Sequence, residues 1–341
     1  MSVPLSILDL SFVREGETPR EALHDSLELA RKAENLGYKR FWMAEHHNMV
    51  GIASAATSVA LGFIAGGTEC IRIGAGGIML PNHSPLVIAE QFGTLASLYP
   101  GRVDLGLGRA PGTDGRTALA LRRNLGNETA DSFPEDVQEL QAYFGDPVPG
   151  QSVHAVPGEG LDVPIWLLGS SLYSAQLSAI LGLPFAFASH FAPEYLLQAL
   201  EVYRAEFRPS QNLEKPYAMV AANVVVDDTD EEAKFLFSSA KIGVLNLLQG
   251  KRGKMQPPIQ DVDAAWSDEQ HAAVDRFLKY SFVGSQATVR SQLEKFVEQT
   301  QADELIVTAR IYDLSARLRS FALLAECWSI RKEGATLVSN Q

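Results

Sequence analysis

Short runs of apolar residues alternate with longer segments of helical periodicity along most of the chain. In the first pair, the apolar run at residues 5–10 precedes a segment in which Leu23, Leu27 and Ala30 recur at helical spacing. A short apolar run favours a buried strand, and apolar residues on one face favour an amphipathic helix. The sequence therefore predicts a strand followed by a helix.

The ends of this first helix carry specific signals. Thr18 can serve as the N-cap residue, Pro19 fits the first helical position, and Glu21 completes a capping box. Gly37 can adopt the left-handed conformation that often follows the last helical residue. We therefore expect the helix to begin after Thr18 and to end before Gly37.

The same alternation continues toward the C-terminus. The expected strands lie at residues 5–10, 40–44, 71–79, 103–106, 165–168, 184–189, 218–226 and 304–309. The expected helices lie at residues 19–36, 53–62, 84–97, 134–144, 171 onward, 193–207, 230–248 and 315–331. Alternating strands and helices indicate a parallel sheet, and eight such units indicate closure into a (β/α)8 TIM barrel. No repeat or linker divides the chain, so we expect a single domain over residues 1–341.

Two long segments interrupt this pattern. Residues 106–127 are rich in Gly, Arg and Pro, and residues 250–266 contain two prolines and a basic run from Lys251 to Lys254. Long loops in a compact domain are usually lids or binding loops. We expect loop insertions at the C-terminal face of the barrel, with residues 250–266 acting as a mobile lid over its mouth.

Composition narrows the classes of function. The formal net charge of −12 argues against nucleic acid or an anionic membrane as a partner, because both require a basic face. The chain has no N-terminal signal pattern and no apolar run near the ~20 residues of a membrane span, so we expect a cytoplasmic protein. Cys70 and Cys327 have no metal or redox spacing, and we expect both to be buried structural thiols.

A barrel of this kind places its active site at the carboxyl ends of the strands. The second expected strand ends in Glu45-His46-His47. Adjacent side chains near a strand end point to opposite sides, and no third ligand follows with a familiar spacing, so we expect no metal site. A histidine in this position suits acid–base catalysis, and a histidine satisfied by neighbouring hydrogen bonds is the alternative.

Two other strand ends are candidates for binding a phosphate. Gly169-Ser170-Ser171 precedes a helix, where free N–H groups and two hydroxyls suit a phosphate, although plain N-capping by a serine is equally open. Arg109 follows a glycine-rich strand end and can bind phosphate through paired donors, unless it is simply a surface arginine. That segment is not a dinucleotide fingerprint, because Pro111 replaces the third glycine.

Gly76 and Gly77 interrupt what should be a central strand. Glycine weakens a strand unless something must approach the backbone closely. A flat ring stacked on the barrel mouth would be one such reason, and a β-bulge is the alternative.

Taken together, these motifs resemble the bacterial luciferase-like superfamily of flavin-dependent monooxygenases. The resemblance spans nearly the whole chain, and the form Ala-Glu-His-His at residues 44–47 is similar to one subgroup of luciferase-like oxidoreductases. The segments that carry it are residues 42–47, 72–81, 100–109 and 165–171.

The resemblance implies a TIM barrel that uses reduced FMN and O2 to oxygenate a small organic substrate. It implies a separate NAD(P)H-dependent flavin reductase as partner, and a homodimer. His46 matches the catalytic histidine, and Gly76-Gly77 matches a pair joined by a cis peptide beneath the flavin. The residues implied in cofactor binding are Gly76, Gly77, Arg109, Gly169, Ser170 and Ser171.

Departures from the family pattern leave parts of the function open. A reactive cysteine and an acidic residue of one luciferase subunit correspond here to Gly108 and Gly169, so light emission is not implied. A deazaflavin-dependent dehydrogenase or reductase shares the barrel and is the second hypothesis. A non-catalytic flavin-binding subunit is the third, and a hydrolase that uses Glu45 or Asp104 with a histidine is the fourth.

Overall fold

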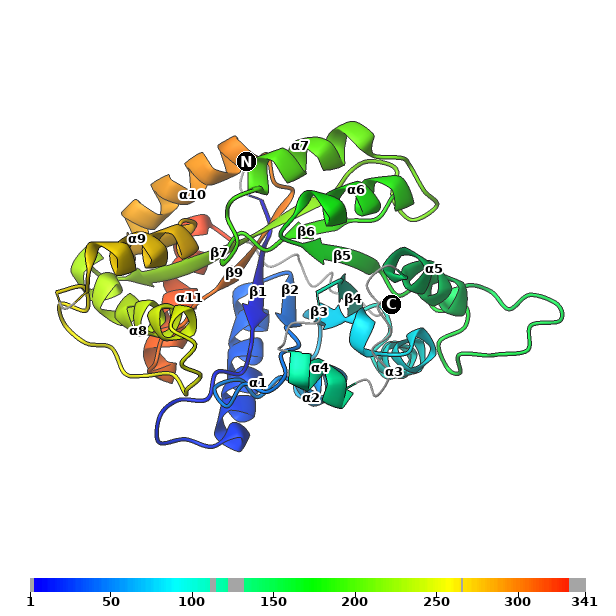
Figure 1. Cartoon of the computed structure of the whole chain (residues 1–341), viewed down its shortest axis with the longest axis horizontal. Helices are drawn as coiled ribbons and strands as arrows, with labels where there is room; N and C mark the ends of the chain where they lie inside the picture. Colours follow the sequence, from blue (N-terminus) through cyan, green and yellow to red (C-terminus); the bar gives the residue numbers. More distant parts are fainter. Residues whose placement is uncertain (1–2, 111–114, 122–131, 265, 331–341) are drawn as a thin grey trace, which may run out of the picture.

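The computed structural model describes residues 3–110, 115–121, 132–264 and 266–330. Within these ranges, nine parallel strands form one sheet. Eight of them close into a barrel, because β1 pairs with both β2 and β9, and β7 pairs with both β6 and β9. Helices surround the strands (Figure 1). The predicted (β/α)8 TIM barrel is confirmed.

The strands are β1 (Leu5–Asp9), β2 (Arg40–Met43), β3 (Arg72–Met79), β4 (Val103–Gly108), β5 (Ile165–Gly169), β6 (Phe185–Phe187), β7 (Ala218–Asp227), β8 (Ser281–Ser285) and β9 (Glu304–Thr308). The helices are α1 (Pro19–Leu36), α2 (Thr57–Gly66), the short 3-10 helix η1 (Leu80–Asn82), α3 (Pro85–Leu98), α4 (Gly115–Leu121), α5 (Phe133–Phe144), α6 (Leu172–Leu181), α7 (Leu196–Glu206), α8 (Asp230–Leu248), α9 (Asp268–Phe277), α10 (Gln286–Thr300) and α11 (Leu314–Trp328). Among the described residues, none of these helices is long and apolar enough to cross a bilayer.

The signals at the ends of α1 are confirmed. Thr18 accepts a hydrogen bond from the N–H of Glu21, and the Glu21 side chain accepts one from the N–H of Thr18. Gly37 ends the helix in the left-handed conformation, with φ of 86°. Helix α8 has the bounds that the pattern predicts.

The sequence pattern missed α4, which lies within the expected loop of residues 106–127, and it missed β8 together with α9 and α10. Strand β8 pairs with the second half of β7, from Asn223 to Asp227. Asn223 pairs with Ser281 on one side and with Thr308 of β9 on the other. Strand β8 therefore lies on the side of β7 that faces β6, beyond the end of β6, and it adds to the barrel without replacing one of its eight strands.

The prediction for the cysteines was wrong at one position. Cys70 is exposed, and Cys327 is half-buried. Cys70 lies in the turn before β3, where its backbone N–H donates a hydrogen bond to Glu34 Oε1 at 2.5 Å. Its side chain therefore takes no part in the core.

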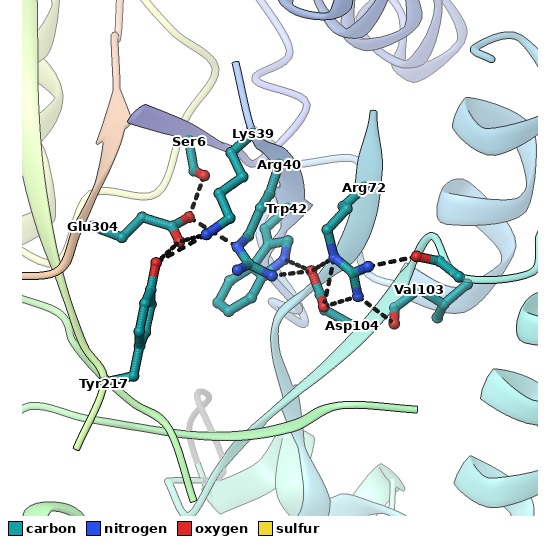
Figure 2. Close-up of polar contacts among 10 residues, drawn as sticks. Ser6, Lys39, Arg40, Trp42, Arg72, Val103, Asp104, Tyr217 and Glu304 are labelled. Atoms are coloured by element: carbon teal, nitrogen blue, oxygen red, sulfur yellow. Dashed lines mark hydrogen bonds and ion pairs between the residues drawn. The ribbon is translucent and has the colours of Figure 1, made fainter. Parts of the chain in front are cut away.

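Charged side chains fill the amino-terminal end of the barrel (Figure 2). Arg40 contacts Glu304 and Asp104, with Nε–Oε1 and Nη1–Oδ2 distances that are both 2.8 Å. Asp104 also accepts hydrogen bonds from Arg72 and from the Trp42 indole N–H. Both carboxylates are fully buried. The remaining contacts of Glu304 come from three polar side chains, Ser6, Lys39 and Tyr217.

A layer of aromatic and aliphatic side chains lies above this network inside the barrel. Trp42 and Trp166 meet edge to face at 5.2 Å, and Arg40 lies over the Trp166 ring at 4.8 Å. Leu8 and Ala44 belong to the same buried cluster and also line the cavity at the mouth. Asp104 therefore lies at the floor, below this layer, so the hydrolase alternative loses Asp104 and retains only Glu45 as its carboxylate.

Candidate active site

A cavity of about 760 Å³ opens at the carboxyl ends of the barrel strands. This volume lies within the ~300–1,000 Å³ that is typical of small-molecule sites. The structure brings every sequence-predicted site residue to its lining. These residues are His46, Gly76, Gly77, Arg109, Gly169, Ser170 and Ser171.

Arg109 and the start of α6 form one side of the cavity. The Arg109 guanidinium lies 3.9 Å from the centre of the Tyr173 ring, and within the described ranges it has no hydrogen-bond or ion-pair partner. Ser171 occupies the N-cap position, but its side chain makes no capping hydrogen bond. Plain N-capping by Ser171 was therefore the wrong alternative, and its hydroxyl remains available beside an unpaired cation.

The Gly76–Gly77 peptide bond is cis, as the resemblance implies. The pairing of β3 with β4 shifts register between Gly76 and Ile78, which is consistent with the β-bulge alternative. A Cβ at Gly77 would lie 2.3 Å from Leu168 Cδ1 and 2.6 Å from the Gly106 carbonyl oxygen. The barrel's own packing therefore requires glycine here, and the stacking of a flat ring on this pair stays a prediction.

Glu45 organises the end of β2. Its Oε1 lies 2.5 Å from His47 Nε2 and 2.8 Å from His83 Nε2, and its Oε2 accepts a hydrogen bond from the Met79 N–H at 3.0 Å. Burial raises the pKa of Glu45, but the hydrogen bonds from the two histidines and from Met79 outweigh burial and hold that pKa below its ordinary value. Glu45 therefore ties the end of β2 to β3 just beyond the two glycines.

Two groups of side chains among the described residues bring possible metal ligands together. The first is Glu45 with His47 and His83. Bonds of ~2.0–2.2 Å to one tetrahedral ion would set the ligand atoms about 3.3 Å apart. Glu45 Oε1 lies closer than this to the Nε2 atoms of both histidines, at the distance of a direct hydrogen bond. The second group is Asp227, Asp228 and Glu232 at the surface. Arg319 already pairs with the two aspartates. The absence of a resident metal stays a prediction.

His46 faces the cavity with an unsatisfied ring nitrogen. Its Nδ1 is buried and has no hydrogen-bond partner among the described residues. Burial and the nearby charge of Arg310 lower the pKa of His46 to about 4. The ring is therefore neutral at pH 7. The alternative of a histidine satisfied by its neighbours fits His47, which contacts Glu45.

The sequence predictions assigned no role to two residues of the cavity. Arg310 follows β9 and His190 follows β6, and both line the mouth. Burial lowers the pKa of Arg310 to about 10 and, together with the Arg310 charge, lowers that of His190 to about 3. Each residue comes one position after an expected strand, and this closeness to a strand end is the same signal that singled out His46.

The loop that was predicted to be a lid lies at the mouth. Lys251 to Met255 line the cavity. Met255 exchanges backbone hydrogen bonds with Val13 and Glu15, at 2.9 and 2.8 Å, and the Lys254 ammonium donates to the Glu17 carbonyl oxygen at 2.6 Å. The placement is confirmed, and the mobility of the loop stays a prediction.

The cavity is basic although the chain is acidic. Glu45 is the acidic residue of its lining, and His47 and His83 already contact that carboxylate. A basic cavity within a chain of net charge −12 provides the local attraction that an anionic ligand needs. The basic residues of the lining are Arg109, Lys251, Arg252, Lys254 and Arg310.

Fold and site together define a TIM-barrel protein with a cation-lined ligand cavity at its catalytic face. The profile of the luciferase-like monooxygenases matches residues 3–304, so the chain belongs to that family. A luciferase-like monooxygenase of Escherichia coli K12 is 55% identical over 322 residues, which cover 94% of this chain and 96% of that protein. An N-acetyl-S-alkylcysteine monooxygenase of Bacillus subtilis is 36% identical over 71% of this chain and 74% of its own length.

Solved structures show the same fold. The crystal structure of apo-MsnO8 has a TM-score of 0.90 at 37% identity and covers 96% of this chain and 99% of its own. The FMN complex of a type II Baeyer-Villiger monooxygenase from Pseudomonas putida has a TM-score of 0.71 at 18% identity, covering 96% of this chain and 97% of that one. An F420-dependent secondary alcohol dehydrogenase has a TM-score of 0.69 at 16% identity, covering 97% of this chain and 100% of that one.

Proposed function

We propose that the chain is a flavin-dependent monooxygenase that takes reduced FMN from a separate NAD(P)H-dependent reductase and uses O2 to oxygenate a small organic substrate. The observation that carries this proposal is the unpaired guanidinium of Arg109, stacked on Tyr173 beside the uncapped start of α6. Such a cradle of planar donors, hydroxyls and helix-start N–H groups suits a phosphate ester.

The residues present fit FMN at this site. Arg109, Ser170 and Ser171 would hold the phosphate, and Gly76 and Gly77 would lie under the ring system. When bound and reduced, the flavin supplies the electrons that activate O2. A relative of known name acts on an N-acetyl-S-alkylcysteine, which supports a small organic substrate.

His46 would hold or move a proton in this cavity. Its ring is neutral at pH 7 because burial and Arg310 lower its pKa to about 4. Its unpartnered Nδ1 can donate a proton to, or accept one from, a ligand group within hydrogen-bond reach. Glu45 acts through the backbone: the N–H of Glu45 donates to the Gly77 carbonyl oxygen at 3.3 Å and keeps the two strand ends together.

Titration of the purified chain with FMN, riboflavin and deazaflavin F420 tests the proposal. Wild type should prefer FMN over riboflavin, since riboflavin has no phosphate. Arg109→Met should weaken FMN binding by about ten- to 150-fold, the value of one charge-assisted hydrogen bond, and should leave riboflavin binding unchanged. Ser170→Ala should show a smaller loss of the same kind.

Two results would contradict this reading. Equal weakening of FMN and riboflavin by Arg109→Met would mean that the arginine only supports the cavity wall. Tighter binding of F420 than of FMN would favour the deazaflavin-dependent alternative, which the fold of the F420-dependent dehydrogenase also accommodates. Turnover of the FMN-loaded chain should require the reductase, NAD(P)H and O2 together.

A further inference from the structure

Arg310 is an unpaired cation in the lining of the cavity. Its Nε is buried without a hydrogen-bond partner, and within the described residues the side chain forms no ion pair. Two buried arginines in the described part of the chain behave differently: Arg40 contacts Asp104 and Glu304, and Arg317 contacts Asp9. Enclosing a charge without an opposite charge is unfavourable. Arg310 therefore has the character of a residue whose counter-charge arrives with a ligand.

The backbone around Arg310 is fixed in place. The Ala309 carbonyl oxygen accepts a hydrogen bond from Arg317 Nε at 2.9 Å, and Arg317 is held in turn by the buried Asp9. On the other side, the Tyr312 hydroxyl donates to the Glu15 carbonyl oxygen at 2.8 Å. These contacts preorganise the segment, so that the guanidinium needs little rearrangement to bind an anion.

Arg310 lies across the mouth from the proposed phosphate site. Arg109 follows β4 and Arg310 follows β9. The barrel order runs β4, β3, β2, β1 and β9, so the two strands stand four steps apart in a ring of eight. The two unpaired guanidinium groups therefore occupy opposite sides of the cavity, and one phosphate bound at Arg109 leaves Arg310 free for a second anion.

We propose that Arg310 binds a carboxylate of the organic substrate, so that this enzyme acts on small carboxylic acids with an apolar body. The inference rests on the proposed function and names its substrate class. The planar fork of a guanidinium matches a carboxylate with two parallel hydrogen bonds.

The surroundings of Arg310 fit such a molecule. Its guanidinium lies 5.4 Å from the centre of the Phe12 ring, and aliphatic and aromatic side chains continue around it. His46 and His190 lie close enough for the Arg310 charge to lower the pKa of both rings, and each has an unpartnered Nδ1. Neutral imidazoles add donors without adding charge. The apolar residues of the lining that share one packed cluster with Phe12 are Leu8, Leu10 and Ile52.

Reduced flavin is the other possible source of a delocalised anion at this place. Its deprotonated ring would also attract a guanidinium. The carboxylate is favoured because Arg310 stands opposite Arg109 and is next to Phe12, at the far side of the cavity from the proposed phosphate site. The two sources predict different effects of the same substitution.

Paired substitutions at the two arginines provide the test. Binding of hexanoate and of its neutral analogue hexanamide is measured calorimetrically on the whole chain without flavin, and FMN and riboflavin are titrated separately. Wild type should prefer hexanoate by about ten-fold or more. Arg310→Met should abolish this preference and keep the preference for FMN over riboflavin. Arg109→Met also removes one positive charge from the cavity. It should keep the preference for hexanoate and abolish the preference for FMN over riboflavin. Arg310→Lys, which keeps the charge but not the fork, should lie in between.

The outcomes separate the readings. A hexanoate preference that survives in Arg310→Met, or that is missing in wild type, overturns the inference. Weaker binding of reduced FMN to Arg310→Met with an unchanged hexanoate preference also overturns it and assigns Arg310 to the flavin. A third outcome is that wild type binds no flavin but prefers hexanoate, and that Arg310→Met lacks this preference. The carboxylate site then stands, and only the proposed function fails.

Discussion

Asp104 offers the sharpest test of how the floor of the barrel is stabilised. Its carboxylate is fully buried and contacts Arg40 at 2.8 Å, Arg72 at 2.5 Å and the Trp42 indole nitrogen at 3.2 Å. Asp104→Asn keeps the shape of the side chain and removes its charge. Breaking a buried ion pair from one side costs ~3–5 kcal/mol. Arg40 retains Glu304 as a partner, so we expect the lower end, about 3 kcal/mol.

The measurement is the free energy of unfolding from urea titration, followed by tryptophan fluorescence and by circular dichroism. Trp42 and Trp166 lie beside the network and report on it directly. Glu294→Gln is the matched control, because it breaks a 2.9 Å pair with Arg290 in which both side chains are more than half exposed. That pair should contribute only ~0.3–0.5 kcal/mol.

A loss below about 1 kcal/mol for Asp104→Asn, which is the range of an exposed pair, would refute the reasoning. The same variant, Asp104→Asn, tests a second prediction, which concerns FMN binding. Since Asp104 lies at the floor and not at the mouth, the folded variant should bind FMN as wild type does. A change in FMN affinity without a change in stability would place Asp104 in the active site after all.

Three further predictions concern the mouth. His46→Ala should lower turnover by ~10²–10⁴-fold with little change in FMN affinity, and loss of flavin binding instead would make His46 structural. The pKa of His190 lies near 3, below its ordinary value, so the unfolded chain binds more protons than the folded chain as pH falls from ~6.5, and stability is lost toward acid. His190→Gln should therefore reduce the slope of unfolding free energy against pH between ~6.5 and 4 by up to ~1.4 kcal/mol per unit, and an unchanged slope in urea titrations would contradict this. Trypsin should cut first at Lys251 in the loop, and FMN should slow that cut; equal rates with and without FMN would argue against a lid.

The barrel was predictable because its strands and helices are local patterns. Apolar runs at β1 and β9 and the capping box of α1 each specify an element without reference to the rest of the chain. Strand β8 was not predictable in this way. Its sequence, Ser-Phe-Val-Gly-Ser, reads as a loop, and it becomes a strand by pairing with β7. The one available signal was the length of β7, whose ten residues extend beyond the end of β6.

The same distinction between local patterns and long-range contacts applies to the candidate site. The positions of His46 and Arg109 followed from where strands end. The sequence did not reveal which cations lack a partner, because the pairing of an arginine depends on contacts distant in sequence. Arg40 finds Glu304, 264 positions away, whereas Arg310 finds no carboxylate within the described residues.

The ion network at the floor limits where ligands can enter and leave the barrel. Arg40, Asp104 and Glu304 close the amino-terminal end of the barrel, and the paired tryptophans seal the level above it. Any ligand of the cavity must therefore enter and leave at the opposite end of the barrel, where the cavity opens. Two ligands bound at the same time would share this single entrance, so each would limit the access of the other. Under the proposed function, the cofactor and the substrate would pass through that entrance in turn.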